Sequence, residues 1–241
     1  MKTLTPSGAP IGATVKDWTP PPLPNWGARS GRFAALERLD ADAHAALLYR
    51  AFAGADAVWD YMPDGPFSSA AQFYRWVRDV ATREDQTFYA IRNLQTDRFE
   101  GMASYLRMNP QAGSIEVGNI SFSPALQRTP AATEAIFLMM EWVFEAGYRR
   151  FEWKCNALNA PSRRAAERFG FSYEGVFRQA TVVKGRSRDT AWFAIIDAEW
   201  PALKEAYTAW LLPANFDSAG QQHERLGDMT SLVRAASDPS L

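Results

Sequence analysis

Hydrophobic and polar residues repeat with two different periods along this chain, and the two periods separate its strands from its helices. Short runs of alternating apolar and polar residues predict strands, whereas apolar residues recurring every three or four positions predict helices. The predicted order is a strand, two helices, three strands, a helix, a strand, a helix, two strands and a last helix. The strands are expected at Arg32–Leu39, Thr87–Asn93, Phe99–Met108, Ile115–Phe122, Arg150–Asn156, Tyr173–Lys184 and Thr190–Asp197.

Capping residues mark where several of the helices begin. Asp40, either Ser68 or Ser69, and Asn159 each precede a helical pattern and can accept a hydrogen bond from its first turn. His44 falls in the first helix and is expected at the surface or its boundary. The helices are predicted at 41–52, 69–85, 131–147, 160–169 and 200–212.

The stretch Ile115–Ala135 joins a strand of β-forming residues to a strongly apolar helix. The strand breaks at Pro124, and a loop of small and basic residues follows. A turn of this kind leaves backbone N–H groups unpaired, and the helix dipole adds partial positive charge there. The stretch therefore has the properties of a phosphate site, with an ordinary strand-to-helix turn as the alternative.

The loop segment Gln127–Ala132 reads Q-R-T-P-A-A and is followed by T-E-A. It resembles the Gln/Arg-x-x-Gly-x-Gly/Ala signature of the GNAT superfamily of N-acetyltransferases, in which loop amides hold the coenzyme A pyrophosphate. Pro130 stands at the first glycine position; it lacks an N–H, but its fixed φ suits a first helical turn. The resemblance implies acetyl-CoA as cosubstrate, with the pyrophosphate on the amides of Arg128, Thr129, Ala131 and Ala132. The residues expected at the coenzyme are Ser121, Phe122, Gln127, Arg128, Thr129, Ala131, Ala132, Thr133 and Asn159.

A second motif begins at Asn159 and reads N-A-P-S-R-R-A-A-E-R-F-G-F-S-Y-E-G-V-F-R, followed later by G-R-S-R-D and W-F-A-I-I-D. It is similar to the branch of that superfamily that includes ribosomal-protein N-terminal acetyltransferases. The resemblance covers about residues 31–200 and implies an α/β (α+β) fold. In this fold helices flank a mixed, mostly antiparallel sheet, whose fourth and fifth strands splay apart around the acyl and pantetheine part of the coenzyme.

The family's reaction needs an oxyanion donor, an acid and a base, because an uncharged amine attacks the acetyl thioester. Backbone N–H groups near Ser121 and Phe122 are implied as the oxyanion donors. Ser162 matches the motif serine and is a candidate acid for the departing thiolate, with helix capping as its alternative. Asn159 is expected to bond the pantetheine, a role compatible with capping.

The base is assigned to a different position from the one that the resemblance implies. Thr181 occupies the position of a glutamate considered for this role in the ribosomal branch. Glu116, flanked by apolar neighbours on the central strand, is the better candidate. The alternative is a solvent-facing residue or a partner of an arginine.

The amine acceptor is expected between the loop Gly54–Phe67 and the hairpin Lys184–Asp189, the two segments that form this side in the family. Trp59, Tyr61 and Met62 of the loop either line a pocket or cover the edge of the core. Acidic residues of the same loop would attract a cationic amine; these are Asp56, Asp60 and Asp64.

Composition sets limits on partners and compartment. The 241 residues carry a net charge of −1 and are 47% hydrophobic, which suits a globular domain without a broad nucleic-acid or membrane surface. A single cysteine, Cys155, and few histidines argue against a disulfide or a structural zinc site, so no metal is expected. The chain shows no leader or membrane-spanning run, and the cytoplasm is its expected compartment. We expect a proline-rich arm over residues 1–30, the acetyltransferase domain over 31–212 and a loosely held polar tail over 213–241.

The sequence as a whole predicts an acetyl-CoA-dependent N-acetyltransferase that acts on a small-molecule amine or a peptide N-terminus. A homodimer is compatible with this prediction. Two alternatives stay open: a non-catalytic module that binds acyl-CoA, and a toxin of the same fold that acetylates aminoacyl-tRNA.

Overall fold

The β-forming segments assemble into one eight-stranded sheet in the computed structural model, which describes residues 3–218 and 220–241. Its order is β3-β4-β5-β6-β7-β8-β10-β9, and each neighbouring pair is antiparallel except β7 and β8. The predicted mixed, mostly antiparallel sheet is confirmed. Its strands are β3 (Ala28–Ser30), β4 (Ala34–Arg38), β5 (Gln86–Asn93), β6 (Arg98–Asn109), β7 (Ser114–Phe122), β8 (Arg150–Asn156), β9 (Ser172–Val183) and β10 (Arg186–Ile196).

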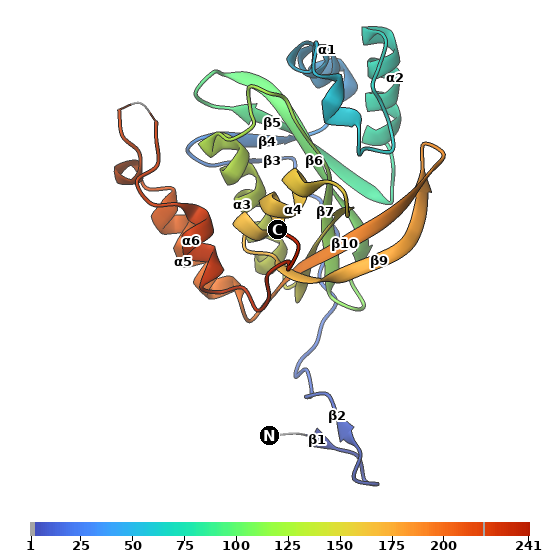
Figure 1. Cartoon of the computed structure of the whole chain (residues 1–241), viewed down its shortest axis with the longest axis vertical. Coiled ribbons are helices and arrows are strands. Elements are labelled where there is room, and N and C mark those ends of the chain that lie inside the picture. Colours follow the sequence, from blue (N-terminus) through green and yellow to red (C-terminus); the bar gives the residue numbers. More distant parts are fainter. Residues whose placement is uncertain (1–2, 219) are drawn as a thin grey trace.

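Helices cover both faces of this sheet (Figure 1). They are α1 (Ala41–Ala51), α2 (Ala70–Ala81), α3 (Pro130–Glu145), α4 (Ala160–Arg168), α5 (Trp200–Trp210) and α6 (Leu226–Ser231), with short 3-10 turns η1 (Asp56–Trp59) and η2 (Pro213–Asn215). Two hydrophobic clusters form the core, one under α1 and α2 and the other around α3, α4 and α5. The successive β5 residues Tyr89 and Ala90 belong to different clusters, as expected for a strand that is buried on both faces.

The helix starts predicted from capping residues are confirmed. Asp40 accepts the Ala43 N–H at 2.8 Å, and Ser69 accepts the Gln72 N–H at 3.2 Å. The prediction that His44 lies at the surface is wrong, since only 3% of it is exposed. Its ring packs against that of Phe99 at 4.6 Å between centroids, so the core encloses the imidazole.

The parallel pairing of β7 with β8 is short, and this feature positions the site. It runs from the pair Ser114–Arg150 to the pair Val117–Trp153 and ends there. Beyond this point β7 contains one residue more than the β6 stretch it pairs with, and Asn119 has a φ of 49°. Such a bulge bends a strand, so β7 parts from β8 over its last residues. The expected splaying of the two central strands is confirmed.

The N-terminal segment lies on the sheet through its aromatic side chains. Trp26 stacks on Tyr89 with 3.7 Å between ring centroids, and the Tyr148 hydroxyl donates to the Pro22 carbonyl at 3.0 Å. Trp26 thus anchors this segment on the sheet. Before it, a small hairpin of β1 (Thr3–Leu4) and β2 (Pro10–Ile11) projects away from the sheet (Figure 1).

The C-terminal segment is firmly attached, and the expectation of a loosely held tail is wrong. Thr230 of α6 is fully buried and donates its hydroxyl to the Arg168 carbonyl at 3.0 Å. Asp238 is 5% exposed and accepts a hydrogen bond from Arg163 Nε at 2.6 Å. The polar composition of the segment reflects such long-range bonds to α4, which a sequence pattern does not reveal.

Candidate active site

The loop between β7 and α3 is held in shape by its own hydrogen bonds. The Leu126 N–H donates to Ser123 Oγ at 3.3 Å, and Thr129 Oγ1 donates to the Leu126 carbonyl at 2.7 Å. Thr129 Oγ1 also accepts the Ala132 N–H at 3.1 Å, so this threonine caps α3. Pro130 takes the first helical position, where the missing N–H costs no helical hydrogen bond.

Among the loop amides expected at a pyrophosphate, those of Arg128 and Ala131 have no acceptor within the described part of the chain. Arg128 is exposed and has a φ of 62°, whereas Ala131 is buried. The N–H groups of Thr129 and Ala132 donate within the loop. Of the four amides expected to hold a pyrophosphate, only Arg128 and Ala131 are therefore unengaged in this conformation.

The other residues expected at the coenzyme lie around the same loop. Gln127 Nε2 donates to the Phe122 carbonyl at 3.0 Å, and Thr133 Oγ1 accepts from Arg168 Nη1 at 3.0 Å. Ser121 is buried on the stretch of β7 that no longer pairs with β8. Backbone groups on that edge of β7 are available to an extended ligand, directly before the N-terminus of α3.

The connection from β8 to α4 brings Asn159, Ser162 and Cys155 together. Asn159 Oδ1 accepts the Ser162 N–H at 3.1 Å, which confirms the capping role. Ser162 Oγ accepts the indole N–H of Trp153 at 3.1 Å, so its own proton remains available for donation. Burial raises the pKa of the neighbouring Cys155 thiol, while a hydrogen bond with Ser162 opposes this effect. A thiol of this kind stays protonated at neutral pH and is a poor nucleophile.

Glu116 is 2% exposed and lies between two cations. Arg107 Nη1 is 2.6 Å from Glu116 Oε1, and Lys154 Nζ is 2.9 Å from Oε2. Burial raises the pKa of the Glu116 carboxyl, and both cations oppose this rise. Lys154 also contacts Glu152 Oε2 at 2.7 Å and lies 3.7 Å from the centre of the Trp192 ring. The arginine partner left open by the sequence is thus present, together with a lysine.

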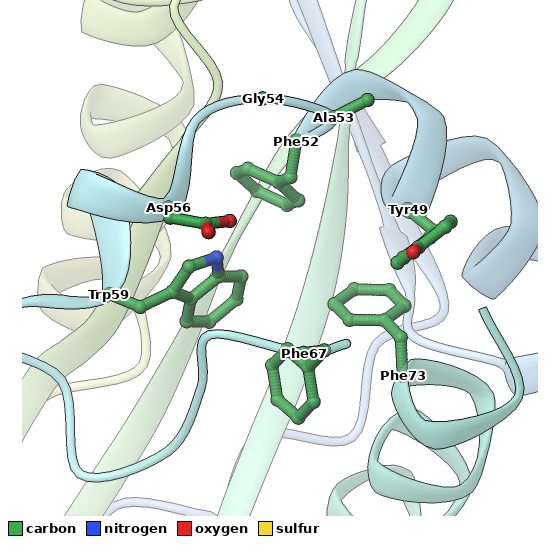
Figure 2. A pocket seen from close by; sticks show the side chains of 8 residues that line it. All are labelled: Tyr49, Phe52, Ala53, Gly54, Asp56, Trp59, Phe67 and Phe73. Atoms are coloured by element: carbon green, nitrogen blue, oxygen red, sulfur yellow. The ribbon is translucent and has the colours of Figure 1, made fainter. Parts of the chain in front are cut away.

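The acceptor loop divides between the core and the surface. Trp59 lines a cavity of about 60 Å³ together with Phe52, Phe67 and Phe73. Figure 2 shows these side chains facing one another. Only 3% of Trp59 is exposed, so its indole covers the edge of the core, as the alternative interpretation stated. Tyr61, by contrast, is 39% exposed.

Two hydrogen bonds tie this loop to the other segments of the site. The Tyr61 hydroxyl donates to the Leu158 carbonyl at 3.3 Å, and Lys184 Nζ donates to the Trp59 carbonyl at 2.8 Å. Met62 is half-buried beside them, in contact with the cluster under α1 and α2. The loop, the β9–β10 hairpin and the β8–α4 connection therefore enclose one side of the splayed strands.

Several functional candidates were missed by sequence reasoning. Lys154 and Glu152 stand two residues apart on β8, and this spacing places both on one face of the strand, which the β7–β8 register shows to be the face of Glu116. That signal was available in the sequence. No such signal was present in the sequence for Arg107 or Asp238. Strand register brings Arg107 to its partner, and the path of the C-terminal segment brings Asp238 to its own.

Residues 3–218 and 220–241 contain no helix that is both long and apolar enough to cross a membrane. The same residues hold no group of three or more His, Cys, Asp or Glu side chains that could bind a metal ion.

Comparison with known proteins places this arrangement among acetyltransferases. Residues 35–172 match the family model of the acetyltransferase (GNAT) domain. A GCN5-related N-acetyltransferase from Brucella melitensis is 45% identical with a TM-score of 0.88, over 90% of this chain and 100% of that one. A probable GNAT acetyltransferase from Chromobacterium violaceum is 42% identical with a TM-score of 0.76, over 82% and 100%.

A more distant neighbour shares the fold. It is a Salmonella typhimurium acetyltransferase that modifies the N-terminal serine of ribosomal protein L7/L12, 20% identical with a TM-score of 0.60, over 69% of this chain and 96% of that one. An L7/L12 alpha-N-protein acetyltransferase at 21% identity, with a TM-score of 0.59 over 69% and 95%, is known in complex with coenzyme A. No curated protein sequence matches the chain.

Proposed function

Because the chain belongs to the acetyltransferase (GNAT) family, we propose that it transfers the acetyl group of acetyl-CoA to a primary amine of a small molecule or a peptide N-terminus. The observation that carries this proposal is the end of the β7–β8 pairing after Val117 and Trp153, next to the N-terminus of α3. An extended pantetheine chain can hydrogen-bond to the unpaired edge of β7. Its pyrophosphate then lies where the helix dipole is positive.

The α3 loop would hold the coenzyme through few but well-placed donors. The unengaged N–H of Arg128 and its guanidinium supply positive charge at the loop, and the Ala131 N–H lies in the first turn of the helix. The Ala132 N–H donates to Thr129 Oγ1, so rotation of the Thr129 side chain would free this N–H for the ligand. Pro130 therefore removes one amide without removing the site.

Acetyl-CoA supplies an activated acyl group, and the side chains around the splayed strands would handle the protons. As the nitrogen bonds to the carbonyl carbon and the carbon–sulfur bond breaks, one proton leaves nitrogen and one must reach sulfur. Glu116 would accept the first, directly or through a water, since burial raises the pKa of its carboxyl. The Ser162 hydroxyl, oriented by Trp153, would donate the second.

The enclosed acceptor side would keep the amine uncharged before attack. Tyr61 and Met62 provide apolar surface, and exclusion of water lowers the pKa of a bound ammonium group. The L7/L12 acetyltransferases support a peptide N-terminus as one class of acceptor.

Turnover measurement tests the proposal. The protein is mixed with acetyl-CoA and a panel of primary amines and peptides, and free thiol release is followed. We expect release that depends on the acceptor and forms the acetylated amine. Binding of acetyl-CoA without turnover on any acceptor would instead identify a non-catalytic acyl-CoA-binding module.

A further inference from the structure

Arg188 of β10 is a cation without a direct partner in the described part of the chain. Within residues 3–218 and 220–241 its side chain makes no hydrogen bond and no ion pair, and its Nε is buried without a partner. The side chain is half-buried, and burial lowers the pKa of its guanidinium. A half-buried cation without an anion costs free energy. Such a residue is favoured only where a bound ligand supplies the missing anion.

The backbone places Arg188 at the enclosed side of the site. Its neighbour Asp189 accepts the Ala157 N–H at 2.9 Å, which fixes this part of β10 beside the β8–α4 connection. Arg188 precedes an irregularity in the β9–β10 register, where the chain departs from regular strand geometry. Arg188 lies three residues before Ala191, which pairs with Cys155 of β8, and the Glu116 carboxylate influences the pKa of Arg188. Its guanidinium therefore lies close to the candidate acid and base, rather than at the α3 loop.

The surrounding charges leave a surplus of positive charge. Lys154 Nζ contacts Glu152 Oε2 at 2.7 Å. Lys154 and Arg107 share Glu116, as described above. The nearby Arg107 charge also lowers the pKa of Arg188. Arg107 and Lys154 therefore each have a carboxylate partner, whereas Arg188 forms no ion pair within the described residues.

We propose that Arg188 binds an oxyanion of the acceptor, so that the amine acetylated by this protein carries a carboxylate close to its nitrogen. This inference rests on the proposed acetyl transfer and narrows its substrate class. A guanidinium matches a carboxylate through two parallel hydrogen bonds and holds it in a fixed direction. Anchored in this way, the amine at the other end of a short acceptor faces the carbonyl carbon. Asp56, Asp60 and Asp64 at the mouth of the loop attract its ammonium group before binding.

Two kinds of molecule offer this chemistry, namely a free amino acid and a peptide with an acidic side chain near its N-terminus. The acceptor panel therefore contains matched pairs: free L-amino acids with their C-terminal amides, and short peptides with Asp or Asn at the second position. Each pair keeps the amine and removes only the carboxylate. A preference within the first pair identifies an amino acid, and a preference within the second identifies a peptide.

The decisive variant is Arg188→Gln, with Arg186→Gln as its control. Arg186 is exposed on the same strand and loses the same charge. For wild type we expect a higher kcat/KM for the carboxylate member of one pair. Arg188→Gln lowers that value roughly 10- to 100-fold, as for loss of a hydrogen bond to a charged group. We expect changes below about threefold for the amide member, for the KM of acetyl-CoA and for Arg186→Gln.

The outcomes separate this inference from the proposed function. Equal use of carboxylate and amide acceptors, or equal loss on both in Arg188→Gln, overturns the inference and leaves acetyl transfer standing. If no acceptor turns over, the proposed function fails. Calorimetry then decides the inference: each carboxylate compound is titrated into protein loaded with coenzyme A. Binding that is lost in Arg188→Gln but kept in Arg186→Gln supports it, and no binding overturns it.

Discussion

The buried ion pair between Arg163 and Asp238 offers a sharp test of how the C-terminal segment supports the site. Arg163 Nε donates to Asp238 at 2.6 Å, Nη1 donates to the Ala157 carbonyl at 2.9 Å, and Nη2 contacts Ser240. Asp238 and Ser240 therefore hold the arginine that follows Ser162 in the chain. Asp238→Asn keeps the shape of the side chain and removes its charge.

The cost follows from burial on both sides of the pair. The Asp238 side chain is 0% exposed and that of Arg163 is 11% exposed. Removing one partner of a buried pair leaves an uncompensated charge, which costs roughly 3 kcal/mol. In a chain of this size each kcal/mol lowers Tm by about 2–4 °C. We expect Asp238→Asn to lower Tm by roughly 6–12 °C at pH 7.

The sign of the pH dependence follows from the pKa of Asp238. Burial raises this pKa, but the hydrogen bonds from Arg163 and Ser240 outweigh burial and lower it below its ordinary value. A carboxyl whose pKa is lowered by folding stabilises the folded state above its unfolded pKa of about 3.9. This contribution disappears as the pH falls through the lower, folded pKa. The stability gap between wild type and Asp238→Asn should therefore close below about pH 4.

Urea unfolding at pH 7 and at a series of acidic pH values measures this gap. Asp228→Asn is the matched control, because Asp228 lies in the same segment, is exposed, and forms no side-chain hydrogen bond or ion pair within the described part of the chain. The control should lie within about 0.5 kcal/mol of wild type. A gap below about 1 kcal/mol at pH 7, or one that persists unchanged at pH 3, would refute the assigned role of the pair.

Three further variants test individual side chains. Ser162→Ala should lower kcat by roughly 10²- to 10⁴-fold if the hydroxyl protonates the thiolate, with the calorimetric Kd of acetyl-CoA little changed; a loss under about threefold would leave Ser162 as a partner of Trp153 only. Glu116→Gln should abolish the rise of kcat/KM with pH, because the ionised carboxylate is the active base and burial raises its pKa. A pH profile identical to that of wild type would exclude Glu116 as the base. Trp59→Ala should lower the free energy of unfolding in urea by roughly 3–5 kcal/mol, because Trp59 is a core residue. Tyr61→Ala should raise the KM of the amine and leave stability unchanged. The reverse pattern would show that Trp59, and not Tyr61, contacts the acceptor.

Local features of the fold were predictable from sequence because they depend on neighbouring residues. Asp40 and Asn159 cap the expected helices, and Pro130 begins α3, since each acts within one turn of its own position. The strand β8 (Arg150–Asn156) has the boundaries that its alternation predicted. The course of β7 was also recognisable, although its bulge at Asn119 was not.

The parts that sequence reasoning missed depend on contacts between distant segments. Arg163 meets Asp238 only because the last residues run back along α4. Glu116 acquires Arg107 and Lys154 through the registers of three strands, and no local pattern encodes that set. For Trp59 the sequence left two interpretations open, and the contacts with Phe67 and Phe73 place its indole at the edge of the core.

Binding of coenzyme A to wild type, Ala132→Asp and Ala132→Asn, measured by calorimetry, tests the central claim most directly. Ala132 is buried in the first turn of α3, where an aspartate would add a negative charge beside the amides expected at the pyrophosphate. Thermal unfolding first confirms that each variant is folded. We predict that wild type binds, that Ala132→Asp loses at least about tenfold in affinity, and that the neutral Ala132→Asn loses clearly less. Unchanged affinity in a folded Ala132→Asp variant would contradict a coenzyme site at this loop.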